Sequence, residues 1–368
     1  MKHAMSLSAV VLVAALGSGC AAPSGGGEAA LGSSEQALDG AVFAWAWVLA
    51  NGTTGSPYAN QSSGSASSSK LAAGQYEVLF NGLHQQGSPQ VVAYGTNAQC
   101  KLFTIPQVNG TRVANYVNCY DPQGASVDSA FVITFNGQPS SGTWYRGGYF
   151  STGGGAGPTL IGGSWNSSGG ANSVTWDATN KVFYATFSGL TFANASVHVT
   201  AYGANDNRCK VVSWGAGSVT VKCFDHAGNA TASGFSISYD EFSAFGGHIG
   251  GHAWMNVGSP SPGYTNSAPV FECDTPGALT AAASGWDLDL TLTKSDWSTD
   301  TGPWIVPMVT AYGGGNTNYC NVVSWSASGS GATSRVRVRC FNGNGVQIDA
   351  SSTQFDATIS HRDYQGPC

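Results

Sequence analysis

Hydrophobic and polar residues alternate along most of the chain, and the alternation recurs in three successive blocks. Alternation with a period of two over five or more residues is typical of a β-strand with one buried face. The clearest runs are Tyr76-Val78-Phe80, Phe183-Ala185-Phe187 and Leu288-Leu290-Leu292 in the middle of the blocks, and Phe131-Ile133-Phe135, Phe235-Ile237-Tyr239 and Phe355-Ala357-Ile359 at their ends. No amphipathic helical pattern exceeds a turn or two, so the sequence predicts an all-β protein.

Each block also contains the tripeptide Ala-Tyr-Gly followed by two cysteines. The pairs are Cys100 and Cys119, Cys209 and Cys223, and Cys320 and Cys340. The midpoint of the first pair falls between Asn109 and Gly110, and Asn-Gly is the preferred sequence for a two-residue type I′ turn. The second pair is centred on Ala216, within a candidate three-residue loop, 215–217.

These midpoints predict that each cysteine pair sits directly across a β-hairpin. Opposed residues of an antiparallel pair are close enough for a disulfide. We therefore expect three cross-strand disulfides that face the core, each stabilising its hairpin by about 3 kcal/mol.

The density of short strands and turns predicts three tandem antiparallel β-sandwich modules, Ig-like or jelly-roll-like. Their expected boundaries are 40–137, 143–240 and 247–361, with a C-terminal tail at 362–368. Short Gly- and Ser-containing linkers join them.

The N-terminus has the pattern of an export signal. Lys2 precedes an apolar stretch from Val10 to Leu16, and Gly-Ser-Gly leads to Cys20. This resembles a bacterial lipoprotein signal peptide, in which the cysteine becomes the lipidated first residue. Gly17 departs from the usual aliphatic residue at its position, and cleavage by an ordinary signal peptidase near Ala21 is the alternative.

The resemblance implies a signal peptide at 1–20 and a lipid anchor on Cys20, followed by a flexible, Gly- and Ser-rich tether at 21–39. The expected location is the outer membrane or cell surface through the lipid anchor, with secretion as the alternative.

Cysteine parity is consistent with this interpretation. Of nine cysteines, eight remain when Cys20 is set aside. An even number suits an oxidising compartment. Three pairs form the hairpin bridges, and Cys273 and Cys368 are left to pair by elimination.

Composition limits the choice of partners. Charged residues make up 9% of the chain, and the 14 Lys and Arg residues form no basic stripe, which argues against a nucleic-acid partner. Beyond the N-terminus no apolar run approaches the length that spans a bilayer. Membrane contact is therefore expected through the lipid anchor alone.

The pattern also resembles a repeat of exported actinobacterial and myxobacterial proteins. The shared features are the Ala-Tyr-Gly strand, a cysteine, an aliphatic pair before Ser-Trp (211–214 and 322–325), and Val-x-Val-x-Cys-Phe. The resemblance covers roughly residues 41–361, although the first block departs from it at 102–105. No activity is attached to this repeat, so the resemblance implies architecture and export only.

Candidate ligand-binding residues lie on the hairpin face opposite the cysteines. Extrapolating the register from the third cysteine pair puts Trp325 directly across from Arg335, with Arg337 on the same strand face and Trp214 at the matching position of the second block. Aromatic rings stack on sugars and Arg side chains bind carboxylates, so this face is a candidate polysaccharide platform. The alternatives are a surface cation–π pair, or burial against a neighbouring module.

Two other groups of residues were weighed as sites. His248 and His252 are four residues apart but have no identifiable third metal ligand. Asp287 and Asp289 alternate with leucines, as on a charged outer strand face. We therefore expect no metal, no cofactor and no catalytic residues.

The expected function is non-catalytic binding or a structural role at the cell surface, with a polysaccharide or another surface protein as partner. A carbohydrate-binding, lectin-like protein that uses exposed aromatics is the alternative, and a secreted hydrolase is a distant third.

Overall fold

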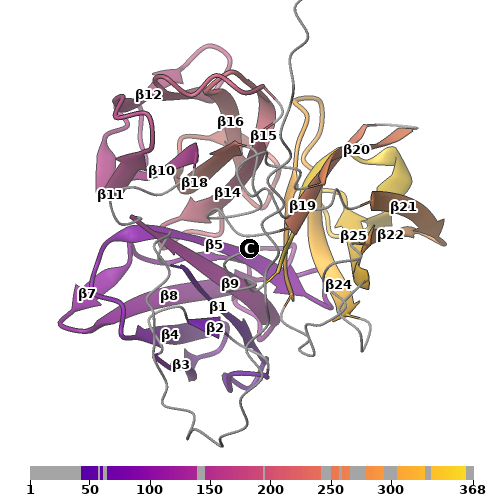
Figure 1. Ribbon diagram of the computed structural model, residues 1–368, viewed down its shortest axis with the longest axis horizontal. Helices are drawn as coiled ribbons and strands as arrows, with labels where there is room; N and C mark the ends of the chain where they lie inside the picture. Colours follow the sequence, from indigo (N-terminus) through magenta and orange to yellow (C-terminus); the bar gives the residue numbers. More distant parts are fainter. Residues whose placement is uncertain are drawn as a thin grey trace, which may run out of the picture. The chain divides into compact units, whose positions relative to one another are not determined.

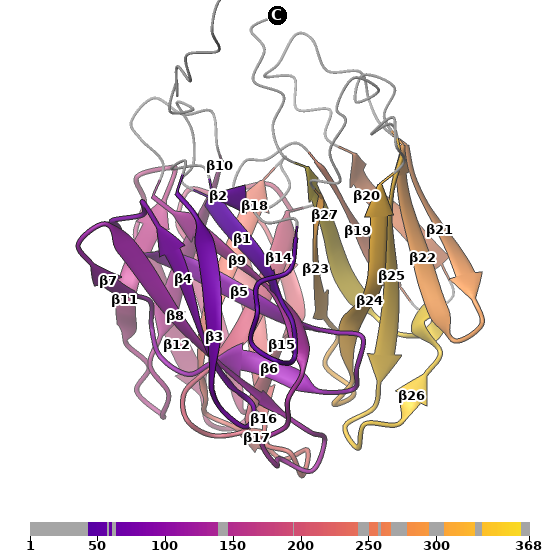
Figure 2. The same cartoon turned by 90° about the horizontal axis from the view of Figure 1, so that it is seen from below.

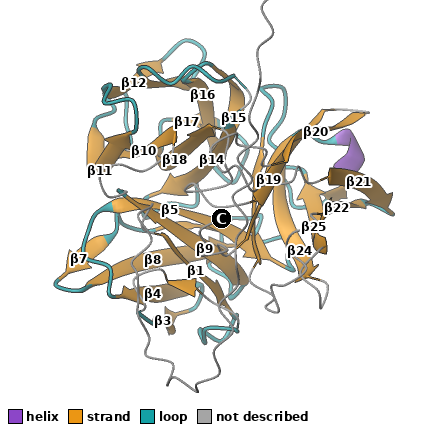
Figure 3. Ribbon diagram, in the orientation of Figure 1, coloured by secondary structure: helices purple, strands orange, loops and turns teal. Residues whose placement is uncertain are grey.

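The computed structural model describes residues 43–56, 59–60, 64–138, 146–193, 195–241, 250–256, 259–265, 278–293, 305–327 and 333–361. In these ranges the regular structure is β throughout, apart from one 3₁₀ turn at Ala350–Ser352 (Figure 3). The predicted all-β fold is confirmed. The signal peptide, the tether, Cys20, Cys273, Cys368 and His248 lie outside the described residues.

We call the described parts of 43–137, 146–241 and 250–361 modules 1, 2 and 3. Module 1 has two antiparallel strand runs, one in the order β2-β1-β9-β5 and one in the order β6-β8-β4-β3, with β7 paired to β8 (Figure 1). The first run continues into a nine-stranded sheet with strands of module 3, and the second into a nine-stranded sheet with strands of module 2. Phe131 and Phe135 of the first sheet share a buried core with Tyr76 and Phe80 of the second. The strands are β1 (Phe43–Val48), β2 (Ala59–Asn60), β3 (Ala66–Ala72), β4 (Gln75–Asn81), β5 (Gly87–Tyr94), β6 (Gln99–Leu102), β7 (Gln107–Asn109), β8 (Arg112–Tyr120) and β9 (Ala130–Gly137).

Module 2 repeats this arrangement. Its sheets have the orders β11-β10-β18-β14 and β12-β13-β16-β15, with β17 paired to β16. Phe150 and Phe235 of the first sheet share a core with Phe183 and Phe187 of the second. The strands are β10 (Arg146–Thr152), β11 (Leu160–Asn166), β12 (Asn172–Asp177), β13 (Val182–Phe187), β14 (Ser196–Tyr202), β15 (Arg208–Gly215), β16 (Ser218–Phe224), β17 (Ala230–Thr231) and β18 (Gly234–Glu241).

Module 3 follows the same plan, with sheets in the orders β20-β19-β27-β23 and β24-β25-β22-β21 (Figure 2). The strands are β19 (Gly250–Asn256), β20 (Ser259–Thr265), β21 (Ala278–Ser284), β22 (Asp287–Thr293), β23 (Ile305–Ala311), β24 (Tyr319–Ala327), β25 (Thr333–Phe341), β26 (Gln347–Ile348) and β27 (Phe355–His361). The pairing is compatible with three tandem sandwiches, and the exact module boundaries stay a prediction.

Alternating burial along the central strands explains why they form. In β4, Tyr76, Val78 and Phe80 are fully buried, while the residues between them are partly exposed. Strands β13 and β22 repeat the pattern with Phe183 and Leu288 among their buried positions. The alternation of hydrophobic and polar residues in the sequence therefore predicted the buried face of these strands correctly.

The three hairpin disulfides are present, and each joins directly opposed residues. Cys100–Cys119, Cys209–Cys223 and Cys320–Cys340 all have Cα atoms 4.0 Å apart. The second cysteine of each pair is fully buried. The cysteine face of the hairpin is thus the core face, as expected.

Beyond the cysteines the predicted register is wrong by one residue in two hairpins. A β-bulge follows Val211 in β15 and Val322 in β24. The extra residue puts Trp325 opposite Val336, and Arg335 opposite Ser326. The expected cross-strand pair of Trp325 and Arg335 does not form, because a bulge between the cysteines and the tryptophan shifts every later partner.

Two hairpin turns also differ from expectation. In the first hairpin Asn109 pairs with Arg112, so the turn residues are Gly110 and Thr111, because β7 pairs with β8 in a register shifted from that of β6. In the second hairpin Gly215 pairs with Ser218, which leaves a two-residue turn at Ala216 and Gly217.

Replacing Ala216 with asparagine should stabilise the second hairpin by about 1 kcal/mol. Ala216 and Gly217 have φ angles of 40° and 73°, and a left-handed conformation is unfavourable for alanine but well tolerated by asparagine. Urea denaturation would measure the gain. The Ser218→Asn variant, one residue past the turn, is the control and should gain nothing, and equal stability of both variants would contradict the prediction.

Candidate functional site

Each module contacts another through its Ala-Tyr-Gly tripeptide and a disulfide hairpin. The tyrosine of one module forms a parallel bridge with the residue two places after the first hairpin cysteine of another. The three bridges are Tyr202 with Leu102, Tyr94 with Val322, and Tyr312 with Val211. Module 2 therefore contacts module 1, module 1 contacts module 3 and module 3 contacts module 2, so the contacts form a closed cycle.

Side chains next to the first cysteines follow the same cycle. Lys101 donates from Nζ to the backbone and side-chain oxygens of Asn205 at 2.9 and 2.7 Å. Lys210 donates from Nζ to Oδ1 of Asn316 at 2.7 Å. At the matching position in module 3, Asn321 reaches the loop after the tripeptide of module 1.

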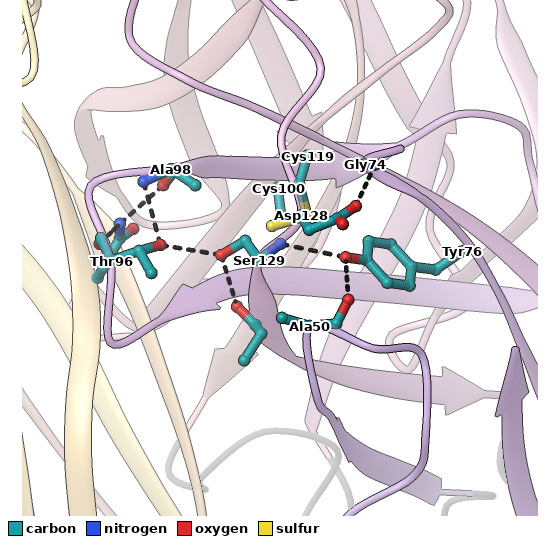
Figure 4. Close-up of a disulfide and its surroundings, with 11 residues drawn as sticks. Ala50, Gly74, Tyr76, Thr96, Ala98, Cys100, Cys119, Asp128 and Ser129 are labelled. Carbon is teal, nitrogen blue, oxygen red and sulfur yellow. Dashed lines mark hydrogen bonds between the residues drawn. A yellow bond between two sulfur atoms is a disulfide. The ribbon is translucent and has the colours of Figure 1, made fainter. Parts of the chain in front are cut away.

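That loop in module 1 is held in place by its own hydrogen bonds (Figure 4). The Thr96 and Ser129 hydroxyls are 2.9 Å apart, and the Ser129 amide donates to the Tyr76 hydroxyl at 3.1 Å. Asn321 donates from Nδ2 to the carbonyls of Thr96 and Ala98 at 2.9 and 2.8 Å. Hydrogen bonds therefore hold the loop at residues 96–98 against the core of module 1, beside the Cys100–Cys119 disulfide.

A cavity of about 80 Å³ lies where the three contacts meet. Equivalent segments of each module line it: 91–93, 199–201 and 309–311 from the tripeptide strands, and 99–101, 206–210 and 318–321 around the first cysteines, with Phe224. The repeat thus builds one shared cavity from corresponding positions of all three modules.

Three cationic side chains line this cavity. Burial lowers the pKa of Lys101 to about 7 and the pKa of Lys210 to about 7. Burial also lowers the pKa of Arg208, which is 8% exposed and lies 5.8 Å from the centre of the Tyr319 ring. Asp206, which pairs with His226, is the acidic residue among the lining residues.

A second buried polar cluster joins modules 2 and 3. Asp356 of β27 accepts from the Val197 amide of β14 at 2.8 Å and is 1% exposed. His198 contacts the Thr310 and Thr358 hydroxyls at 3.0 and 2.9 Å. Burial is the main reason that the pKa of Asp356 rises to about 8.

The candidate tryptophans lie at the module contacts. Trp325 is half-buried, with its ring centre 4.9 Å from that of Tyr94 and 5.4 Å from that of Trp47. Trp214 is also half-buried and lies 5.0 Å from Tyr312. Both rings thus contact the tripeptide tyrosine of another module, which is the packing alternative weighed above. Their proposed part in ligand binding stays a prediction.

The candidate arginines are not gathered around Trp325. Arg337 makes two hydrogen bonds with Asp289, at 2.7 and 2.8 Å, and Arg339 does the same with Asp287. Arg335 is exposed. Asp287 is only 6% exposed, so this carboxylate is paired and buried instead of solvated as expected.

Lys101, Arg208 and Lys210 were not among the site residues predicted from the sequence. The signal was present: in two hairpins a lysine directly follows the first cysteine, on the face away from the core. Their burial depends on contacts between modules, which the hairpin pattern alone does not predict.

Within the described ranges, no three His, Cys, Asp or Glu residues are grouped so that they could hold a metal ion. Among those same residues no helix has the length and apolar character needed to cross a bilayer. The side chain of His252 is not described.

No protein-family model, curated protein or solved structure matches the chain significantly. The resemblance to the exported repeat and to a lipoprotein signal therefore stays a prediction. The disulfide-containing all-β structure that the repeat implies is present.

Proposed function

We propose that this chain is an exported protein that acts at the cell surface by binding or as a structural component, without catalysis. The observation that carries the proposal is the closed cycle of module contacts. The same repeat positions, namely the tripeptide tyrosine and the residues after the first cysteine, make these contacts in every module. Because equivalent positions of every module join it to another module, the contacts favour a structural role for the chain.

The three disulfides are typical of an oxidising compartment outside the cytosol. The finer proposal is that Cys20 carries a lipid anchor and that residues 21–39 hold the modules away from the outer membrane. A polysaccharide or another surface protein remains the proposed partner. Sugar stacking on Trp325 or Trp214 is less well supported, because both rings already contact tyrosines of other modules.

Fractionation of cells that express the full chain tests this proposal. The native chain should be found in the membrane fraction, incorporate labelled fatty acid and be cut when intact cells are treated with protease. The Cys20→Ala variant should lose the label and the membrane association, because the thiol that accepts the lipid is gone.

The Ser18→Ala variant, two residues before the lipidation site, is the control and should behave like the native chain. Retention of the native chain inside the cell, or labelling that persists in Cys20→Ala, would overturn the proposed location. Hydrolysis of surface polysaccharide by the purified chain would overturn the non-catalytic role.

A further inference from the structure

The cavity at the module contacts has an excess of positive charge. Lys101, Arg208 and Lys210 are each less than one-tenth exposed. Asp206, which lines the cavity and also pairs with His226, attracts Lys101 and Arg208, and Asp225 attracts Arg208, so two carboxylates face three buried cations. The oxygens that Lys101 and Lys210 contact belong to neutral asparagines, Asn205 and Asn316. Burying cations without a matching anion is unfavourable, so the excess charge calls for a counterion.

Hydrogen-bond donors also remain unused there. Arg208 donates from its two terminal nitrogens to the Asp225 and Gly343 carbonyls at 3.1 and 3.5 Å, but its buried Nε has no partner within the described part of the chain. The Lys101 ammonium has three protons and makes two hydrogen bonds to Asn205, so one donor is left. An acceptor with several oxygens would satisfy both groups.

The size of the cavity limits what fits. The cavity volume of about 80 Å³ is several times the about 10–15 Å³ that one water molecule needs on the same scale, so the cavity accommodates a small ion. Arginine and lysine together are the side chains that bind sulfate and phosphate groups.

From these observations we propose that the cavity formed by Lys101, Arg208 and Lys210 binds a small free oxyanion of the sulfate or phosphate type, which links modules 1 and 2. This site goes beyond the proposed surface role and does not depend on it. The anion would contact residues of module 1 and module 2 at once, because Lys101 lies on β6 and the other two cations lie on β15.

Binding should depend on pH. The lysines titrate near neutrality because they are buried, and an anion favours their charged form. The other titratable groups beside the cavity are Asp206, paired to His226, Asp225, which attracts Arg208, and Tyr319 of β24, whose pKa burial raises to about 12. On β14, His198 contacts the lining residue Thr310. Raising the pH from 6 to 8 removes protons from the lysines and should weaken binding.

Equilibrium dialysis of the full disulfide-bonded chain against radiolabelled sulfate, whose charge is the same at pH 6 and pH 8, tests this proposal at a constant ionic strength set with chloride. We expect saturable binding of one ion per chain at pH 6 and an affinity about tenfold lower at pH 8. Lys210→Met should reduce the affinity about tenfold or more, because it removes a charge-assisted donor. Methionine keeps the unbranched apolar stem of the buried side chain.

Lys181→Met is the matched control, because Lys181 is exposed and does not line the cavity. If Lys210→Met fails to fold, Lys101→Met replaces it. Any of three results would overturn the site. Chloride could abolish sulfate binding by competition, or the native chain could show no saturable binding. The Lys210→Met and Lys181→Met variants could also bind with equal affinity.

Discussion

The Trp325→Ala variant is expected to lose about 3 kcal/mol of unfolding free energy. Trp325 of module 3 contacts the rings of Tyr94 and Trp47 of module 1 edge-on, so alanine leaves a cavity at this contact. Deletion of a large buried ring costs about 3 to 5 kcal/mol, and half-burial puts Trp325 at the lower end. Urea denaturation of the disulfide-bonded chain would measure the loss.

Trp286 provides the matched control. It is also a tryptophan of module 3 but is 60% exposed, so Trp286→Ala should change stability by less than about 0.5 kcal/mol. The two variants also distinguish a packing role from a ligand platform. If Trp325→Ala is as stable as Trp286→Ala and loses only ligand binding, the packing role assigned to Trp325 is wrong.

The second large effect is expected at Asp356, whose carboxyl should lower the stability of the native chain relative to Asp356→Asn as the pH rises. The folded carboxyl keeps its proton up to about pH 8, whereas an unfolded aspartate releases it near 3.8. Between these values the folded carboxyl holds a proton that the unfolded one has lost, so the contribution of Asp356 to stability is greatest at the acidic end and falls by about 1.4 kcal/mol per pH unit.

The Asp356→Asn variant should remove this dependence, because the amide has no proton to lose. Relative to the native chain it should gain about 4 kcal/mol between pH 5 and pH 8, measured by urea denaturation at both values. Glu77→Gln retains Asp356 and is the control, with the pH dependence of the native chain. A native chain whose stability rises over this range relative to Asp356→Asn would contradict the assignment.

Local patterns predicted the parts of the fold that depend on neighbours in sequence. Alternation in β4 and β13 identified strands and their buried faces, because one side of each strand packs against a single core. The cysteines predicted the opposed pairs, since a disulfide requires close Cα atoms. Both signals lie within one hairpin.

The candidate site depended on features that are not local. A bulge after Val322 is compatible with the same alternating sequence, so the register counted from Cys320 assigned Trp325 the wrong partner. Lys210 lies on the outer face of its own hairpin, yet it is buried and donates to Asn316 of module 3. A polar residue on an outer strand face does not reveal whether water or another module covers it.

The cycle of tyrosine bridges has a consequence for biosynthesis. Tyr94 is translated long before its bridge partner, Val322. The strands of module 1 pair with one another, but the bridge at Tyr94 must wait until the third hairpin has been made. A chain truncated before the third hairpin would leave the Tyr94 and Trp47 rings uncovered, and such exposed apolar surface favours aggregation.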